Sequence, residues 1–186
     1  MSGPDLDLEL LGWPPDGPTL RLDYREFSYA GKFVMSSTGK AVARENDEVV
    51  AAVAFNEDRT DPSTMWLRYV TVRADRRGAG IGPRLVEFVV DRARERGYEL
   101  VRIAVNNPFA YHALYRAGFR YTGEETGIAE LVLERDLDSE APADPDRYEA
   151  GLSLFLDRNL AEAERRFVSD KREAGPPGDR TVGGSE

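Results

Sequence analysis

The residue types best suited to chemistry lie in a short glycine-rich stretch, Arg77-Gly78-Ala79-Gly80-Ile81-Gly82. It follows a run that reads as a β-strand and opens directly into a run with helical spacing. A loop of this kind directs the unpaired N–H groups of the first helical turn toward one point, where an anion is favoured. The stretch therefore predicts an anion-binding loop flanked by arginine side chains.

Three kinds of phosphate-binding loop carry comparable glycines. A P-loop ends in Gly-Lys-Ser/Thr, whereas this loop ends in Gly80-Ile81-Gly82-Pro83. A dinucleotide-binding fingerprint needs a third glycine at the position of Pro83, and three predicted strands already precede this loop. A nucleotide-binding domain is therefore the weaker alternative. The remaining interpretation is a pyrophosphate held by loop amides and arginines without a metal ion.

The elements that position this loop form a strand, loop, helix, strand, helix unit, with the loop at the carboxyl end of a strand. We expect a strand over 65–73 and a helix that has Pro83 at its first position and stops at Gly97. A strand over 99–105 follows. Asn107 is the predicted N-cap of a second helix that runs to about Ala117.

Turn and linker residues divide the rest of the chain into further predicted segments. Two runs that meet at Asn46-Asp47 predict a β-hairpin, and the second run is apolar on both faces, so it should be central in the sheet. The other predicted segments are a flexible arm over 1–18, a strand over 19–24, one or two helical turns within 25–36, closing strands over 119–124 and 128–137, a linker over 138–146, an amphipathic helix over 147–172 and a disordered tail over 173–186, with the main domain spanning 19–137.

Composition excludes several classes of function. The 186 residues contain no cysteine, which excludes disulfides, thiolate metal sites and a covalent cysteine intermediate. The one histidine, His112, is expected to be a surface or partly buried helix residue, so a histidine metal site is not expected. A net charge of −9 argues against nucleic acid, and no apolar run is long enough for a membrane span. We expect a cytoplasmic protein of halophile-like, arginine-rich composition.

The motifs resemble those of the Gcn5-related N-acetyltransferases (GNAT). Arg77-x-x-Gly80-x-Gly82 matches the family's pyrophosphate-binding motif, and Leu114-Tyr115 followed by Gly118-Phe119 matches the end of its last conserved helix. The resemblance covers residues 19 to about 135. It implies an α/β (α+β) fold with a mixed, mostly antiparallel sheet of six to seven strands flanked by helices, to which this chain adds a C-terminal helix.

The resemblance also implies a cofactor and site residues. Acetyl-CoA would be the acyl donor, with no metal, and the backbone of Val70 and Val72 would pair with its pantetheine arm. Asn107 matches a CoA-contact position only with a one-residue insertion, so it is interpreted mainly as a helix cap. Tyr115 would protonate the departing thiolate or donate a hydrogen bond to it. The residues placed around the pyrophosphate are Arg77, Gly78, Ala79, Gly80, Ile81, Gly82 and Arg84.

The predicted reaction is direct transfer of an acetyl group to a primary amine, on a small molecule or a peptide, in a ternary complex. No acidic residue occupies the strands where relatives often carry the general base. Two alternatives therefore stay open: the base is Glu57, Asp58 or Glu130 acting through water, or the amine enters already deprotonated. Trp66 and Tyr69 could line the acceptor pocket or belong to the core. The alternative function is an inactive acyl-CoA sensor or interaction module, and a homodimer is possible.

Overall fold

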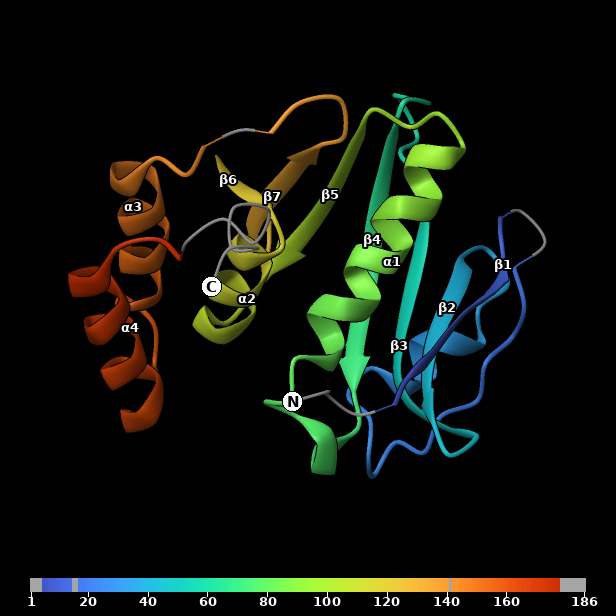
Figure 1. The fold of residues 1–186 in the computed structure, drawn as a ribbon. Helices are drawn as coiled ribbons and strands as arrows, with labels where there is room; N and C mark the ends of the chain where they lie inside the picture. The colour runs from blue at the N-terminus through green and yellow to red at the C-terminus, as the bar shows by residue number, and fades with distance from the viewer. Residues whose placement is uncertain (1–4, 15–16, 141, 178–186) are drawn as a thin grey trace. The chain divides into compact units, whose positions relative to one another are not determined.

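The structure is a computed structural model that describes residues 5–14, 17–140 and 142–177. Its elements fall into two units, Met1–Val101 and Arg102–Glu186, and strand β5 (Leu100–Val105) contains the boundary between them. Figure 1 labels the strands and helices. Each unit is described by itself below.

Four strands of the first unit pair antiparallel in chain order: β1 (Asp7–Gly12), β2 (Gly39–Glu45), β3 (Glu48–Glu57) and β4 (Thr64–Val72). Asn46 and Asp47 both have positive φ, 53° and 67°, as a tight two-residue hairpin turn requires. Residues 50–55 of β3 are fully buried. The predicted hairpin and the central position of its second strand in this ladder are therefore confirmed.

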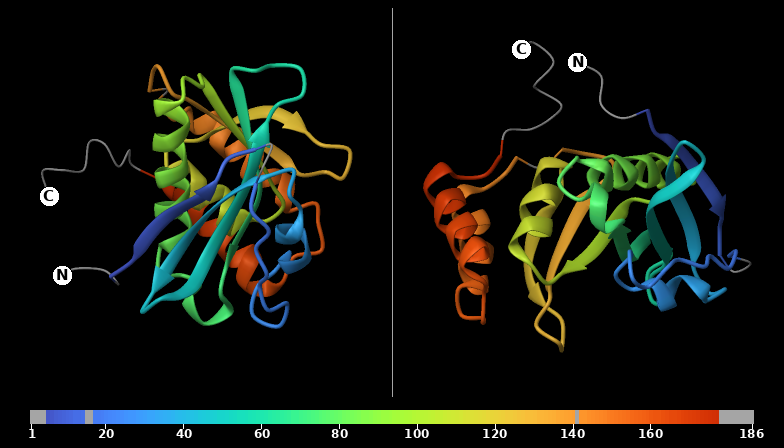
Figure 2. Two further views of the ribbon diagram at one scale, coloured as in Figure 1. Left: turned by 90° about the vertical axis from the view of Figure 1, so that its right-hand side faces the viewer. Right: turned by 90° about the horizontal axis from the view of Figure 1, so that it is seen from below.

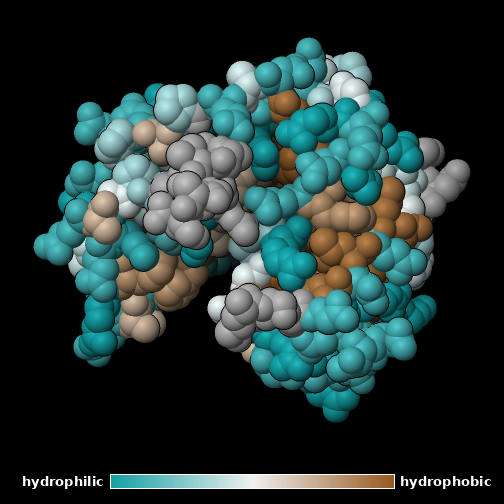
Figure 3. All heavy atoms as spheres, viewed as in Figure 1, coloured by the Kyte–Doolittle hydropathy of each residue, from teal (hydrophilic) through white to brown (hydrophobic). Residues whose placement is uncertain are grey.

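Helix α1 (Ile81–Glu95) packs on one face of this sheet, and the short 3-10 helix η1 (Ala30–Val34) lies on the other (Figure 1; Figure 2, right). The buried face of α1 consists of the residues whose spacing predicted it, among them Leu85, Val86 and Val89. Polar residues cover much of the visible surface of this unit, with a strip of hydrophobic residues beside α1 (Figure 3). The 3-10 helix confirms the helical turns predicted within 25–36.

The first strand of the sheet is β1, not the predicted strand over 19–24. β1 pairs with β2 along its length, and Glu9 forms an ion pair with Arg44 (3.1 Å) across that pairing. Residues 19–24 instead cross the other face of the sheet, where Leu20 and Leu22 pack on the core and Leu20 N donates to Phe33 O (2.9 Å). Most of the predicted arm is therefore an edge strand or lies outside the described residues.

The second unit carries the remaining strands in the order β5, β7 (Leu131–Asp136), β6 (Arg120–Glu125), with β6 and β7 antiparallel. Arg102 on β5 bonds Glu134 on β7 at 2.8 Å. Helix α2 (Pro108–Arg116) agrees with the predicted helix after Asn107. With seven strands among the described residues, mostly antiparallel, and helices beside them, the predicted mixed α/β fold is confirmed.

The C-terminal extension contains two helices, α3 (Pro145–Phe155) and α4 (Glu162–Ala174), in place of one helix over 147–172. The break follows Phe155, where the apolar spacing widens to five residues before Leu160. The Glu164 carboxylate accepts the N–H of Ala161 (3.0 Å) and so starts α4 anew. Two residues of the predicted tail, 173 and 174, end α4, and 178–186 lie outside the described residues. Nowhere in 5–14, 17–140 and 142–177 is a helix both long and apolar enough to cross a membrane.

Candidate active site

The predicted anion-binding loop joins β4 to α1 through a short 3-10 helix, η2 (Ala74–Arg76), and Gly80 is the N-cap of α1. Gly78 and Gly80 have φ of 86° and 78°. A Cβ placed on either glycine would meet no atom within 4 Å. The backbone conformation, and not crowding, therefore requires glycine here, and the space above the loop is open.

The first turn of α1 sets the number of backbone donors. The helix begins at Ile81, two residues before the predicted start at Pro83, so Ile81 and Gly82 carry the N–H groups that have no carbonyl in a preceding turn. Pro83 has no N–H. The amide of Arg84 donates to Gly80 O (3.3 Å) within the helix itself. The amides able to face an anion are thus those that precede Pro83.

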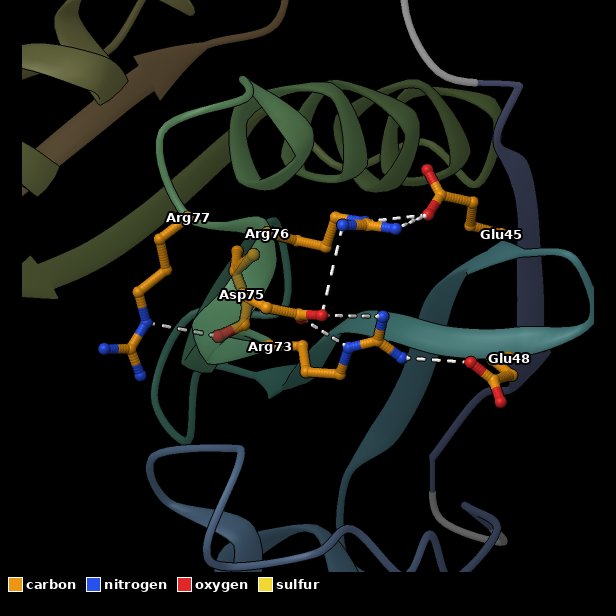
Figure 4. Close-up of polar contacts among 7 residues, drawn as sticks. Glu45, Glu48, Arg73, Asp75, Arg76 and Arg77 are labelled. Carbon is orange, nitrogen blue, oxygen red and sulfur yellow. Dashed lines mark hydrogen bonds and ion pairs between the residues drawn. The ribbon is translucent and has the colours of Figure 1, made fainter.

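Two arginines beside the loop are held by carboxylates (Figure 4). Arg73 lies 2.7 Å from Asp75 and 3.3 Å from Glu48. Arg76 lies 2.5 Å from Glu45 and 3.9 Å from Asp75. Glu45 ends β2 and Glu48 begins β3, so this network attaches the loop to the β2–β3 turn. Arg73 and Arg76 therefore stabilise the conformation of the loop.

Arg77 differs from these two. Its guanidinium points away from the network in Figure 4 and donates to Val72 O (3.4 Å) and to the Ser28 hydroxyl (3.3 Å). Among the residues that the structure describes, no carboxylate forms an ion pair with Arg77. Its charge is therefore available to an anion. The contact of Ser28 was not predicted, because 49 positions separate it from Arg77 and no motif marks it.

Val70 and Val72 lie half-buried on β4, opposite Val53 and Ala51 of β3. The register between β3 and β4 shifts next to them and leaves Arg68 as an extra residue on β4, which is a β-bulge. β4 thus leads into the loop as predicted. The pairing of Val70 and Val72 with a cofactor stays a prediction.

The second unit holds Asn107 and Tyr115. Asn107 is the N-cap of α2, and its side-chain oxygen accepts the N–H of Ala110 (2.8 Å), as its predicted capping role requires. The Tyr115 side chain projects from α2 into packed surroundings and is 2% exposed. Its hydroxyl oxygen accepts the N–H of Tyr121 (3.0 Å).

Asp58 is poorly suited to act as a general base. Its carboxylate accepts the N–H groups of Thr60 (2.9 Å) and Asp61 (3.1 Å) and the indole N–H of Trp66 (2.5 Å). These hydrogen bonds, that of the Thr60 backbone foremost, lower the pKa of Asp58 to about 2. Asp58 therefore organises the β3–β4 turn. Glu57, beside it, accepts a hydrogen bond from the Tyr98 hydroxyl (3.0 Å).

The aromatic residues of β4 have mixed surroundings. Trp66 is half-buried, donates to Asp58 and lies under the guanidinium of Arg68 (5.1 Å from the ring centroid). Tyr69 packs against the core of the first unit and against the half-exposed ring of Tyr29 (5.6 Å). Trp66 is thus engaged by the β3–β4 turn, whereas Tyr69 presents part of its ring beside Tyr29. Neither ring is fully buried.

His112 has a structural partner. It is partly buried on α2, as predicted, and its Nδ1 lies 2.8 Å from the Tyr148 hydroxyl. Burial, followed by the charges of Lys171 and Arg116, lowers the pKa of His112 to about 4, so the ring is neutral at pH 7. Across the described part of the chain, no group of three or more side chains of the metal-binding types lies close enough to hold an ion.

Comparisons with known proteins place these observations in one family. A model of the acetyltransferase (GNAT) family matches residues 6–119, more than half of the chain. No curated protein sequence matches. An acetyltransferase of Bacillus subtilis, solved in complex with CoA, superposes with a TM-score of 0.55 at 18% identity over 71% of this chain and 99% of that one. An IAA acetyltransferase from Bacillus cereus gives 0.55 at 20% identity over the same shares. YncA of Salmonella typhimurium, solved with acetyl-CoA, gives 0.50 at 20% identity over 57% of this chain and 69% of that one.

Proposed function

Because the chain belongs to the GNAT family of acetyltransferases, we propose that it transfers an acetyl group from acetyl-CoA directly to a primary amine. One observation carries the proposal. The loop before α1 combines first-turn amides, open space above Gly78 and Gly80, and the Arg77 guanidinium, which no carboxylate neutralises within the described residues. This combination suits the pyrophosphate of CoA.

The proposed donor site uses consecutive residues in distinct roles. The amides of residues 77–82 would surround the pyrophosphate, and the Arg77 side chain would add a charge-assisted hydrogen bond. The amide of Arg84, which the sequence also suggested as a donor, instead donates to Gly80 O within α1, so it is left out of the proposed donors. The backbone of Val70 and Val72 would bind the pantetheine arm, and Asn107 would contribute chiefly by starting α2. Structures of similar fold solved with CoA or acetyl-CoA support this choice of donor.

In the proposed reaction the neutral amine attacks the thioester carbonyl carbon. The C–N bond forms, the C–S bond breaks, and the amine loses one proton to solvent. The Tyr115 hydroxyl gives its proton to the departing thiolate and is reprotonated from solvent. Because the pKa of Asp58 is far below neutral, we assign it no part in deprotonating the amine. Two routes to the neutral amine therefore remain in the proposal: deprotonation by Glu57 or Glu130 through water, or entry of an amine that is already deprotonated.

The acceptor is proposed only as a class, a primary amine on a small molecule or a peptide. Acetyl-CoA would be incubated with the protein and a panel of such amines, and free thiol would be followed by its reaction with a chromogenic disulfide. Thiol release that requires both protein and amine is the expected result, with acetylated amine confirmed by mass spectrometry.

The same assay separates the alternatives. CoA binding by calorimetry without thiol release from any amine would favour an inactive acyl-CoA-binding module over an enzyme. Preferential binding of NAD or ATP over CoA would contradict the proposal that the loop binds CoA, and it would support the nucleotide-binding alternative instead.

A further inference from the structure

Helix α3 follows the part of the chain that the family model matches, and it docks directly on the helix that carries Tyr115. In the second unit α3 contacts both α2 and β6. The two helices approach closely at Gly151, where a Cβ would lie 2.2 Å from the Tyr111 hydroxyl oxygen. Any larger residue at 151 would push α3 away from α2, so the sequence of α3 is fitted to this contact.

Tyr148 of α3 is fixed through both its backbone and its side chain. Its carbonyl accepts the Tyr111 hydroxyl (2.9 Å), and its own hydroxyl lies 2.8 Å from Nδ1 of His112. Its ring stands nearly edge-on to the ring of Tyr115, with centroids 4.8 Å apart at 73°. Tyr148 and Tyr111 are both fully buried. The ring of Tyr115 therefore has a rigid neighbour on its α3 side.

The other sides of Tyr115 are also occupied. The Tyr111 ring lies 5.0 Å from it on the same helix, and the Arg120 guanidinium lies 5.3 Å from its centroid. The hydroxyl is tethered by the N–H of Tyr121. An aromatic ring with neighbours on these sides has little freedom to swing, so removing one neighbour opens room for a different rotamer.

We propose that Tyr148 is a positioning residue. It holds the ring of Tyr115 so that the Tyr115 hydroxyl oxygen stays within hydrogen-bonding distance of Tyr121 N. This inference rests on the role of Tyr115 in the proposed function. It gives the C-terminal extension a part in the chemistry of the preceding domain. His112, which is neutral at pH 7, takes part by bonding the hydroxyl of Tyr148.

The test compares Tyr148→Leu with Phe155→Leu. Phe155 is a matched control, because it is another buried aromatic residue of α3, whose ring contacts Tyr111 at 5.9 Å and has no ring contact with Tyr115 among the described residues. Misplacement of a reacting group lowers turnover, so Tyr148→Leu should reduce kcat by about tenfold with the KM for acetyl-CoA unchanged. Phe155→Leu should reduce kcat much less, and Tyr148→Phe, which keeps the ring, should restore most of it.

A second measurement does not depend on activity. Hydrogen exchange of the Tyr121 amide, followed by NMR, reports whether the Tyr115 hydroxyl still accepts that N–H. We expect exchange to become several-fold faster in Tyr148→Leu than in Phe155→Leu. Equal exchange in the two variants would overturn the proposal, whether or not an amine substrate has been found.

A double variant distinguishes this proposal from the function on which it rests. In a Tyr115→Phe background, Tyr148→Leu should have no further effect on kcat, because the group that it positions is gone. A tenfold effect that persists there would mean that Tyr148 acts on stability or on another group, and the proposal fails. If Tyr115→Phe alone leaves kcat unchanged, the role of Tyr115 and the positioning role fail together, while acetyl transfer itself stands.

Discussion

In the first unit, the predicted anion-binding loop is made of consecutive residues, whereas in the second unit Tyr115 is held by residues from three separate elements. The loop needs two glycines at positive φ and the start of α1, all within residues 77–82. Tyr115 depends on Tyr121 of β6 and Tyr148 of α3, up to 33 positions away in sequence. One region therefore derives its chemistry from local backbone conformation, and the other from tertiary packing.

This difference has a practical meaning for how each region responds to change. A site built mainly from backbone amides tolerates most side-chain replacements, apart from those at Gly78, Gly80 and Arg77. A packed side-chain site can be disturbed from a distance, since an altered neighbour moves the reacting group. We expect distant substitutions to affect kcat in the second unit and to leave the donor-binding loop unaffected.

The largest expected effect follows from Tyr115→Phe. Loss of a general acid should lower kcat by about 100-fold or more, while the affinity for acetyl-CoA, which the loop provides, stays unchanged. The variant also leaves Tyr121 N without its acceptor, which should cost about 1–3 kcal/mol of unfolding free energy. Steady-state kinetics and urea unfolding measure the two effects.

Tyr111→Phe is the control for that loss of stability, because it also removes one buried hydroxyl bond from α2 (2.9 Å to Tyr148 O). Its kcat should fall far less. If Tyr115→Phe raised the dissociation constant of acetyl-CoA instead of lowering kcat, the proposed separation of binding and chemistry between the two regions would be wrong.

A smaller effect is expected from Arg77→Gln. Removing one charge-assisted hydrogen bond to phosphate should weaken acetyl-CoA binding by about tenfold, measured by calorimetry. Arg76→Gln removes the same charge from the same loop, but from a side chain already paired with Glu45. It should mainly lower the melting temperature. Equal loss of affinity in both variants would show that overall charge, and not a direct contact of Arg77, favours the anion.

The smallest effect, on stability alone, is expected from Asp58→Asn. Asp58 lies in a turn whose hydrogen bonds join residues close in sequence, and we propose no part for it in the reaction. Because the pKa of Asp58 is lowered from 3.8 to about 2 in the folded state, its ionised form stabilises the protein above about pH 4, and this contribution is lost as the pH falls toward 2. Urea unfolding should show a less stable variant at pH 7 and a smaller difference from wild type at pH 3. A fall in kcat at neutral pH would instead implicate Asp58 in the reaction.

Elements with strong local signals could be predicted from the sequence. The Asn46-Asp47 turn, the Asn107 cap and the amphipathic spacing of α1 each depend on residues within a few positions of one another. The same holds for the glycine loop. These features share a cause, since the residue types within a short stretch determine their hydrogen bonds, φ angles or buried face.

Features that depend on a distant partner could not be predicted. Residues 7–12 and 19–24 alternate alike, and only pairing with β2 makes the first a strand. Alternation indicates that one face is buried, but it does not identify a hydrogen-bonding partner. The Ser28 contact of Arg77 and the Tyr148 contact of Tyr115 are of the same kind.

Pro83 has a consequence for how the donor-binding loop responds to ionic strength. By removing an N–H from the first turn of α1, it would shift more of the pyrophosphate's affinity from neutral amide hydrogen bonds to the charge-assisted hydrogen bond proposed for Arg77. In about 1 M salt the screening length falls to about 3 Å, so the ionic part of the Arg77 contact should weaken more than the amide hydrogen bonds do. The proposed donor site would therefore combine two kinds of contact, and the salt concentration of the surroundings would change how much each contributes to cofactor affinity.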